Sequence, residues 1–215
     1  MMKTLTKYLN EKLIIFPSQV DEKSGINQQF DEKLVINKDY KDLYTCAPTS
    51  WEELRNIVEY RYYKFGPGTK DKPIDFNDVD VSNIDLFYDK RTGLFYRTKF
   101  EYIDLSDWDV SNVKDMGAMF NICKQLKSVG DLSNWDVSNV EDMYHMFGGC
   151  PQLTSVGDLS NWNVSRVRDM SAMFFNCKQL KSVGDLSNWD VSNVERMNFM
   201  FNNSGITNIP KWYKK

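Results

Sequence analysis

The sequence contains few of the residues on which most enzymes and metal sites depend. It has one histidine, His145, and four cysteines, none of which belongs to a CxxC pair. Structural zinc sites commonly draw ligands from such pairs, and nucleophilic sites set a histidine beside a serine or cysteine. No glycine-rich loop has the GxxxxGK[ST] spacing that binds nucleotide phosphates. We therefore expect a protein that is not an enzyme and has no metal ion or other cofactor.

Long apolar runs and a strong charge bias are also missing. No run of roughly 18 apolar residues is present, so we expect no membrane span. The first apolar run, Leu13–Phe16, is too short for a secretory signal, which needs roughly 7–15 residues. The net charge is only −3, which does not favour a nucleic-acid partner. These absences predict a soluble protein without a conventional signal peptide.

The chain does contain an internal repeat with a period of 27 residues. Its four copies are Trp108–Phe120, Trp135–Phe147, Trp162–Phe174 and Trp189–Phe201. A fixed period of this length is typical of stacked repeat architectures. Ten apolar positions recur in phase, which in the second copy are Leu132, Trp135, Val137, Val140, Met143, Met146, Phe147, Cys150, Leu153 and Val156. Because one coil alone buries too little apolar surface to offset its ordering entropy, we predict that the coils stack and share these side chains.

The repeat divides the chain into five parts. We assign an N-terminal arm to residues 1–47, a capping helix and loop to 48–72, and a degenerate first repeat with an aromatic hairpin to 73–104. Regular repeats follow at 105–203, and a C-terminal cap at 204–215. Within the arm, helical spacing of leucines and Tyr8 predicts a short helix over 3–14.

The clearest helix prediction is Trp51–Phe65. Ser50 and Glu53 have the spacing of a capping box, and Gly66 followed by Pro67 ends the helix. Because a terminal coil otherwise exposes its apolar side, we expect this helix to cover the first coil.

The aromatic segment Phe87–Tyr96 departs from the repeat. The sequence RTG within it predicts a hairpin turn between aromatic strands. Two interpretations are open: an inserted recognition hairpin, or a loop that closes the first coil.

Cysteine and aspartate recur in phase with the repeat. Cys123, Cys150 and Cys177 form either a buried row of free thiols or disulfides between coils; an odd number in a chain without an export signal favours free thiols. Two rows of aspartates suggest either turn capping or calcium binding. They are Asp115, Asp142 and Asp169, and Asp104, Asp131, Asp158 and Asp185. We favour turn capping because Arg196 interrupts the first row and every Asp adjoins a turn. His145 is interpreted as a surface residue.

The unit Trp135–Leu153 resembles the repeats of BspA-like leucine-rich-repeat proteins. The match is good over 105–203 and weak over 78–84. The resemblance implies an α/β repeat fold: a short, right-handed solenoid with strands near Leu126–Val129 and Val140–Met143 and a helical turn around Tyr144–Gly148. Members are mostly bacterial surface or adhesion proteins, and similar repeats occur in phages of gut bacteria. The missing signal and the leading helix favour the phage-encoded type, hence the cytoplasm or a phage particle rather than a cell surface.

The resemblance and the absence of catalytic motifs predict a scaffold for protein–protein interaction. Its partner surface is expected where the copies differ, at Tyr144, Arg166, Arg168, Phe175 and Phe199. Large aromatic side chains and arginines dominate binding hot spots. The alternative for these positions is ordinary drift at solvated sites. The alternative functions are a carbohydrate- or calcium-dependent binding or adhesion module, which the aromatic hairpin would suit, and a structural component of a virion.

Overall fold

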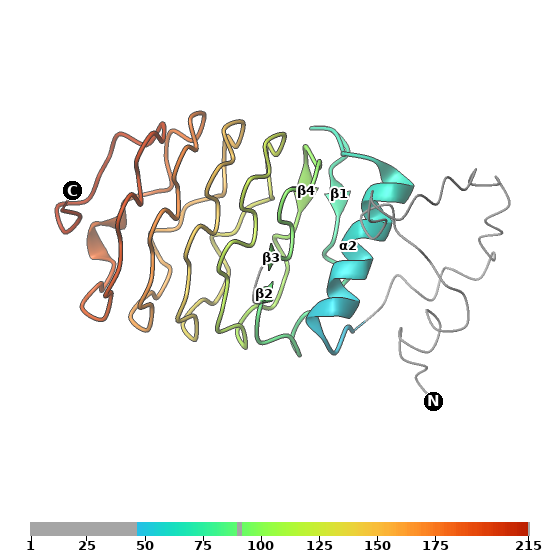
Figure 1. Ribbon diagram of the computed structural model, residues 1–215, viewed down its shortest axis with the longest axis horizontal. Helices are drawn as coiled ribbons and strands as arrows, with labels where there is room; N and C mark the ends of the chain where they lie inside the picture. The colour runs from blue at the N-terminus through green and yellow to red at the C-terminus, as the bar shows by residue number, and fades with distance from the viewer. Residues whose placement is uncertain (1–46, 90–91, 215) are drawn as a thin grey trace, which may run out of the picture.

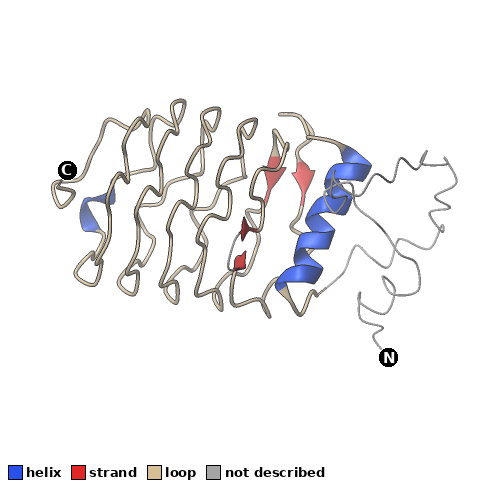
Figure 2. Cartoon of the chain, in the orientation of Figure 1, coloured by secondary structure: helices blue, strands red, loops and turns tan. Residues whose placement is uncertain are grey.

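The structure is a computed structural model that describes residues 47–89 and 92–214. The repeats lie side by side in one row, with a helix at the N-terminal end (Figure 1). Regular elements are few and short (Figure 2): helix α2 (Trp51–Phe65), strands β1 (Ile74–Asp75), β2 (Tyr88–Asp89), β3 (Thr92–Gly93) and β4 (Ile103–Asp104), and the 3₁₀ turn η3 (Leu186–Asn188). The predicted helix 3–14 and Cys46 lie outside the described residues. The chain has a repeat fold in which turns form most of each coil.

Backbone hydrogen bonds between equivalent positions hold neighbouring coils together. Strand β1 pairs with β4 in parallel, and isolated parallel bridges continue the pairing from coil to coil, as at Asp142 and Asp169. In addition, every inner coil has four alternate N–H groups that donate to the next coil, and we call these four groups the donor row. In the second copy its members are Met143, His145, Phe147 and Gly149, whose acceptors are the carbonyls of Asp169, Ser171, Met173 and Phe175 at 2.7–3.0 Å.

The regular elements expected within the repeats do not form. The strands predicted near Leu126–Val129 and Val140–Met143 are reduced to single bridges at Ser128 and Asp142. The helical turn predicted at Tyr144–Gly148 is wrong. His145 has a φ of 52°, and this left-handed conformation turns the chain instead of continuing a right-handed helix. Alternate N–H groups are thereby turned toward the next coil.

Two ladders of aromatic rings occupy the core. The rings of Trp108, Trp135 and Trp162 stack at successive centroid distances of 6.4 Å with interplanar angles of 6° and 1°. Each indole Nε1 donates to a carbonyl one coil back, as Trp135 does to Leu105 at 3.0 Å. Phe120 stacks on Phe147 in the same way at 5.3 Å. All ten apolar positions of the second copy are buried, which confirms their predicted placement.

The three cysteines of the repeats are free and buried, as predicted. Each thiol donates to a carbonyl one coil back: Cys123 to Phe95, Cys150 to Phe120 and Cys177 to Phe147, at 2.8–3.0 Å. Burial raises the pKa of Cys177 to about 12, so this thiol stays protonated at neutral pH. The cysteines therefore act as small core residues that also satisfy backbone carbonyls.

Helix α2 has the predicted bounds. Its first turn is capped as predicted, except that the Glu53 carboxylate has a different partner. Ser50 Oγ accepts from the Glu53 N–H at 3.2 Å, as a capping box requires. The Glu53 carboxylate returns to the N–H and hydroxyl of Thr49, at 2.8 and 3.1 Å, instead of the Ser50 N–H. At the other end Gly66, with a φ of 74°, donates to Tyr62 and ends the helix.

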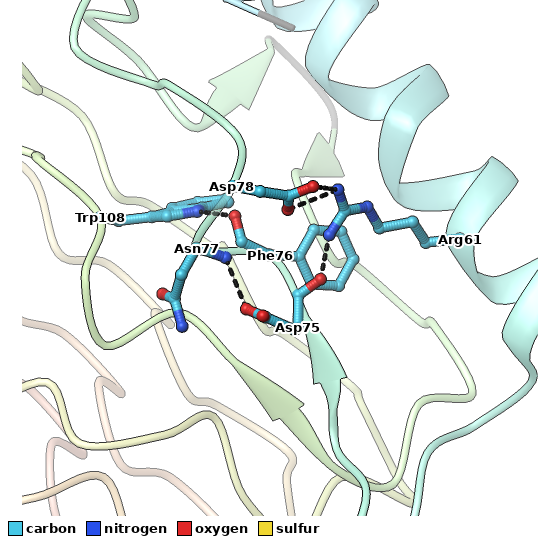
Figure 3. A network of polar contacts seen from close by, with 6 residues as sticks. All are labelled: Arg61, Asp75, Phe76, Asn77, Asp78 and Trp108. Carbon is cyan, nitrogen blue, oxygen red and sulfur yellow. Dashed lines mark hydrogen bonds and ion pairs between the residues drawn. The ribbon is translucent and has the colours of Figure 1, made fainter. Parts of the chain in front are cut away.

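A buried arginine attaches α2 to the first coil (Figure 3). Arg61 is 4% exposed, and its Nη2 lies 2.6 and 2.8 Å from the two carboxylate oxygens of Asp78. Its Nη1 donates to the Asp75 carbonyl, and its guanidinium lies 4.8 Å from the centroid of the Phe76 ring. The Phe76 carbonyl accepts in turn from Trp108 Nε1 at 2.8 Å. Through its contacts with residues 75–78, Arg61 therefore links the helix to the tryptophan ladder.

The aromatic hairpin closes the first coil. Strands β2 and β3 pair antiparallel, and the segment Thr92–Gly93 belongs to β3 instead of the turn. Phe87 and Phe95 are fully buried, and Phe95 stacks on Phe120 at 5.2 Å. A Cβ on Gly93 would lie 2.0 Å from the Ala118 carbonyl oxygen, so only glycine allows this close approach. Two of the four aromatic side chains that favoured a recognition hairpin are therefore inaccessible, and Tyr88 and Tyr96 are only half-buried.

We expect Arg61→Ala to lower the free energy of unfolding by about 3 kcal/mol, because it leaves the Asp75 carbonyl and Asp78 without their partner. Urea unfolding followed by tryptophan fluorescence measures the change. The matched control is Lys178→Ala, an exposed cation on a later coil, which should stay within about 0.5 kcal/mol of the wild type. A result for Arg61→Ala as small as that of the control would contradict the role of this contact.

Candidate functional site

The five predicted partner-binding residues are all exposed. Tyr144 is 43%, Phe175 38% and Phe199 62% exposed, unusually high values for large apolar side chains in this protein. Arg166 and Arg168 are exposed as well. All five follow or precede buried core residues on the same coils, so the fold fixes where each side chain emerges.

The structure brings Tyr144 and Phe175 together through the only histidine. The rings of Tyr144 and His145 meet edge to face at 4.4 Å, and the rings of His145 and Phe175 at 6.3 Å. Burial lowers the pKa of His145, so its ring is neutral at pH 7. These three residues form an uncharged aromatic cluster that spans two neighbouring coils.

Arg166 and Arg168 line a shallow polar basin of about 350 Å³ together with Glu141, Asn193 and Glu195. Arg166 occupies a position that is asparagine in the other regular copies, where the side-chain amide donates to a serine carbonyl one coil back. It donates instead to Asn139 Oδ1 at 2.8 Å. Arg168 lies 3.6 Å from Glu195. The basin carries both signs of charge, with its arginines partly neutralised by its own carboxylates.

Phe199 does not belong to the aromatic cluster. It is on the last coil, next to the coil of Phe175, and within the described residues its ring is not in contact with Tyr144, His145 or Phe175. The predicted residues therefore divide into the aromatic cluster, the polar basin and Phe199. The cluster and the basin both come from the segments 141–148 and 166–175 and the coil that follows them.

The row of Asp115, Asp142 and Asp169 caps turns, as predicted. Each carboxylate accepts a hydrogen bond from the backbone N–H two residues further along the chain, at 2.7–2.8 Å. Arg196 ends the row, with Nε 2.7 Å from Asp169 Oδ2. In the described part of the chain no group of three or more His, Cys, Asp or Glu residues is arranged to hold a metal ion.

The second row of aspartates also caps turns, and its close contacts explain why the facing positions on the next coils are glycine. Asp131 Oδ1 accepts from the Ser133 N–H at 3.0 Å, and the other members bond in the same way. Gly157, one coil on, has a φ of 88°, and a Cβ there would lie 2.0 Å from Asp131 Oδ1. The capped turn of one coil thus fits against a glycine of the next.

The first aspartate row has a gradient of pKa values. Burial raises the pKa of Asp115 to about 6; the charge of Asp142 adds to this effect and the Gly117 N–H opposes it. Burial also raises the pKa of Asp142. Burial acts in the same sense at Asp169, but Arg196 and the bonds from Ser171 outweigh it and hold that pKa below its usual range. The free-energy cost of an ionised, partly buried carboxylate is therefore greatest at Asp115, the end of the row farthest from Arg196.

Sequence reasoning missed the histidine within the aromatic cluster and the acidic side of the basin. His145 stands where the other copies have Ala118, Ala172 and Phe199, but only the ring contacts show that it joins Tyr144 to Phe175. One signal for the basin was present. The same repeat position reads Lys114, Glu141, Arg168 and Glu195, so charges of opposite sign alternate from coil to coil.

Comparison with known proteins places the chain in a family. A family profile described as "Mycoplasma protein of unknown function, DUF285" matches residues 75–212, well over half of the sequence. The chain belongs to the DUF285 family. The DUF285 match begins within β1 and takes in every coil, whereas α2 lies before it.

Other comparisons are weaker. A crystal structure of a leucine-rich repeat protein from Eubacterium ventriosum is 18% identical over 57% of this chain, with a TM-score of 0.30. The aligned region covers 36% of that protein's chain, so this chain spans about a third of its length. No curated protein matches the sequence. Among the described residues, no helix is both long and apolar enough to cross a membrane.

We expect Asp115→Asn to stabilise the protein at pH 8 and to have no such effect at pH 4. The folded-state pKa of Asp115 is above its unfolded value, so ionisation costs stability as pH rises from about 4 to about 6, and the cost is complete above that range. The shift of about two units, reduced for the partly exposed carboxylate, predicts a gain of about 1–2 kcal/mol at pH 8.

Asparagine keeps the acceptor for the Gly117 N–H, so the variant removes only the charge. Urea unfolding of variant and wild type at both pH values tests this. Asp190→Asn is the matched control, because Asp190 caps an exposed turn and the bond from Ser192 lowers its pKa. Its variant should be no more stable than wild type at pH 8. An equal gain for Asp115→Asn at pH 4 and pH 8 would contradict the electrostatic explanation.

Proposed function

We propose that this DUF285 protein is a non-enzymatic scaffold for protein–protein interaction. In this proposal the repeat fold is a right-handed, leucine-rich-repeat-like solenoid of the BspA-like type, whose coils present variable side chains from a fixed core. The proposed location, the cytoplasm or a phage particle, is part of the same proposal and follows from the likeness to the phage-encoded members of that family.

The observation that carries the proposal is the pairing of an aromatic cluster with a charged basin on the same coils. Tyr144, His145 and Phe175 are held in edge-to-face contact on two neighbouring coils, and Arg166 and Arg168 come from the second of these. Exposed aromatic rings surrounded by polar groups are the usual composition of a protein-binding hot spot. The core beneath is nearly identical in all copies, so packing does not explain why the copies differ at these positions.

The fold also suits a preorganised binding surface. The core side chains beneath Tyr144 and Phe175, Met143 and Phe174, are fully buried, and the surrounding backbone is hydrogen-bonded on both sides to adjacent coils. A surface of this kind loses little conformational entropy when a partner binds.

The carbohydrate alternative has less support. Phe87 and Phe95 of the hairpin are buried in the core, so a sugar cannot stack on them. The ring of Tyr96 already has the Arg97 guanidinium 5.1 Å from its centroid. The calcium alternative would need the aspartate rows, whose carboxylates already accept backbone hydrogen bonds.

We expect the triple variant Tyr144→Ala/Arg168→Ala/Phe175→Ala to fold normally and to lose its partner. All three side chains are exposed, so the loss in unfolding free energy should be about 1 kcal/mol or less in total. Capture of proteins from a lysate of the source organism on immobilised wild type and variant, compared by mass spectrometry, measures binding.

The matched control is Lys124→Ala/Lys178→Ala/Lys181→Ala, which removes three exposed side chains, two of them from the coil that also carries Arg168 and Phe175. The control should capture the same protein as wild type. If the aromatic and arginine variant captures it equally well, the binding surface lies elsewhere.

A further inference from the structure

The C-terminal end of the stack leaves one donor row open. In the coil before the last, the N–H groups of Met170, Ala172, Phe174 and Asn176 donate to the carbonyls of Arg196, Asn198, Met200 and Asn202 at 2.7–2.9 Å. The equivalent groups of the last coil belong to Met197, Phe199, Phe201 and Asn203. None of these four N–H groups has an acceptor in the part of the chain that the structure describes.

Apolar side chains lie beside this open row. Val191, Val194 and Met197 are only partly buried, whereas the equivalent Val164, Val167 and Met170 are 1% exposed or less. Phe199 is 62% exposed. These four residues together with the N–H groups of 197, 199, 201 and 203 form what we call the open edge.

The segment after the last repeat covers a different part of the same coil. Trp212 extends the tryptophan ladder, stacking on Trp189 at 6.3 Å and donating from Nε1 to Leu186 at 2.8 Å. Tyr213 meets Phe201 edge to face at 5.1 Å. The rings of Trp189 and Phe201 are thus covered, and the open edge is left beside them.

We propose that the open edge binds an extended segment of a partner protein, whose backbone carbonyls accept from the donor row of residues 197–203. Its apolar side chains would pack on Val191, Val194, Met197 and Phe199. Adding an extended segment to an exposed edge is an established mode of peptide recognition, in which main-chain hydrogen bonds supply affinity and side-chain contacts supply specificity. This surface adjoins the polar basin, because Asn193 and Glu195 of the basin flank Val194, and it includes Phe199.

The direction of the hydrogen bonds decides against a second copy as the occupant. Within each coil the donor row points toward the C-terminal end, so two copies meeting tail to tail would set donors against donors. The other end of the stack is covered by α2, which Arg61 attaches to the first coil (Figures 1 and 3). In the part of the chain that the structure describes, the C-terminal end of another copy thus presents donors, and α2 lies over its N-terminal end.

The common direction of the donor-row hydrogen bonds also gives the open edge a partial positive charge, which favours a hydrogen-bond acceptor. Peptide dipoles aligned through successive coils place their positive ends at the last donor row, as at a helix N-terminus. Backbone carbonyls are the groups this row binds everywhere else in the stack. A partner segment that supplies them would continue the pattern by one further layer.

A peptide taken from the chain itself provides a defined probe. Residues 167–176, VRDMSAMFFN, supply the carbonyls of Asp169, Ser171, Met173 and Phe175 that the preceding donor row binds. The acetylated and amidated peptide is added at millimolar concentration to the full chain labelled with ¹⁵N. We expect chemical-shift changes at the amides of Met197, Phe199 and Asn203, slower hydrogen exchange there, and no such changes with a scrambled peptide.

Phe199→Gly tests the side-chain part of the edge without straining the backbone, because residue 199 has a φ of 60° and glycine accepts that conformation. We expect it to weaken peptide binding about tenfold, as loss of an aromatic anchor does. Ala172→Gly, at the same repeat position one coil earlier with a φ of 55°, is the matched control and should bind like wild type.

Three results would overturn the proposal. The peptide leaves these amides unchanged or shifts other residues, or Phe199→Gly binds it as tightly as wild type. The third is that light scattering shows a dimer in which the same amides are already protected without peptide, which would make a second copy the occupant.

Discussion

The structure depends on one interaction, the hydrogen bonding of each coil to the next through alternate backbone N–H groups. A coil has almost no regular structure of its own, and its buried peptide groups are satisfied because the neighbouring coil lies at a fixed distance and register. The aromatic ladders depend on the same register, since each indole of the tryptophan ladder and each thiol of the repeats donates to a carbonyl one coil back. The hydrophobic core and the polar backbone network therefore form together or not at all.

This interdependence separates what the sequence must keep from what it is free to vary. Positions such as Trp135, Cys150 and Gly157 satisfy both packing and a hydrogen bond or a close approach, and substitution there disturbs two coils. Tyr144, Arg168 and Phe175 satisfy neither requirement, since their backbones are fixed while their side chains are exposed. A surface for recognition can change on such a fold without altering the coils that present it.

The sequence alone predicted the features that depend on residue type and period. The buried phase of the repeat, the free thiols, the turn-capping aspartates and helix α2 all follow from spacing and side-chain chemistry. The expected strands and helical turn did not, because Ala118, His145 and Ala172 adopt positive φ without being glycine, and residue type gives no sign of it. The exposure of the five candidate residues could be inferred from their variability, but their division into three places could not. Ring contacts, the basin and the end of the stack depend on three-dimensional neighbours that one repeat does not reveal.

The open row at one end and the attached helix at the other have a consequence for how such a chain evolves. Every inner coil meets its neighbours through the same set of donors and acceptors, so a recombination event that duplicates or deletes a whole 27-residue unit joins surfaces that already match. Such an event changes the length of the protein and the distance between its ends but neither end itself. The distance between a partner bound at α2 and a partner bound at the last coil would therefore differ among related proteins by whole multiples of one coil.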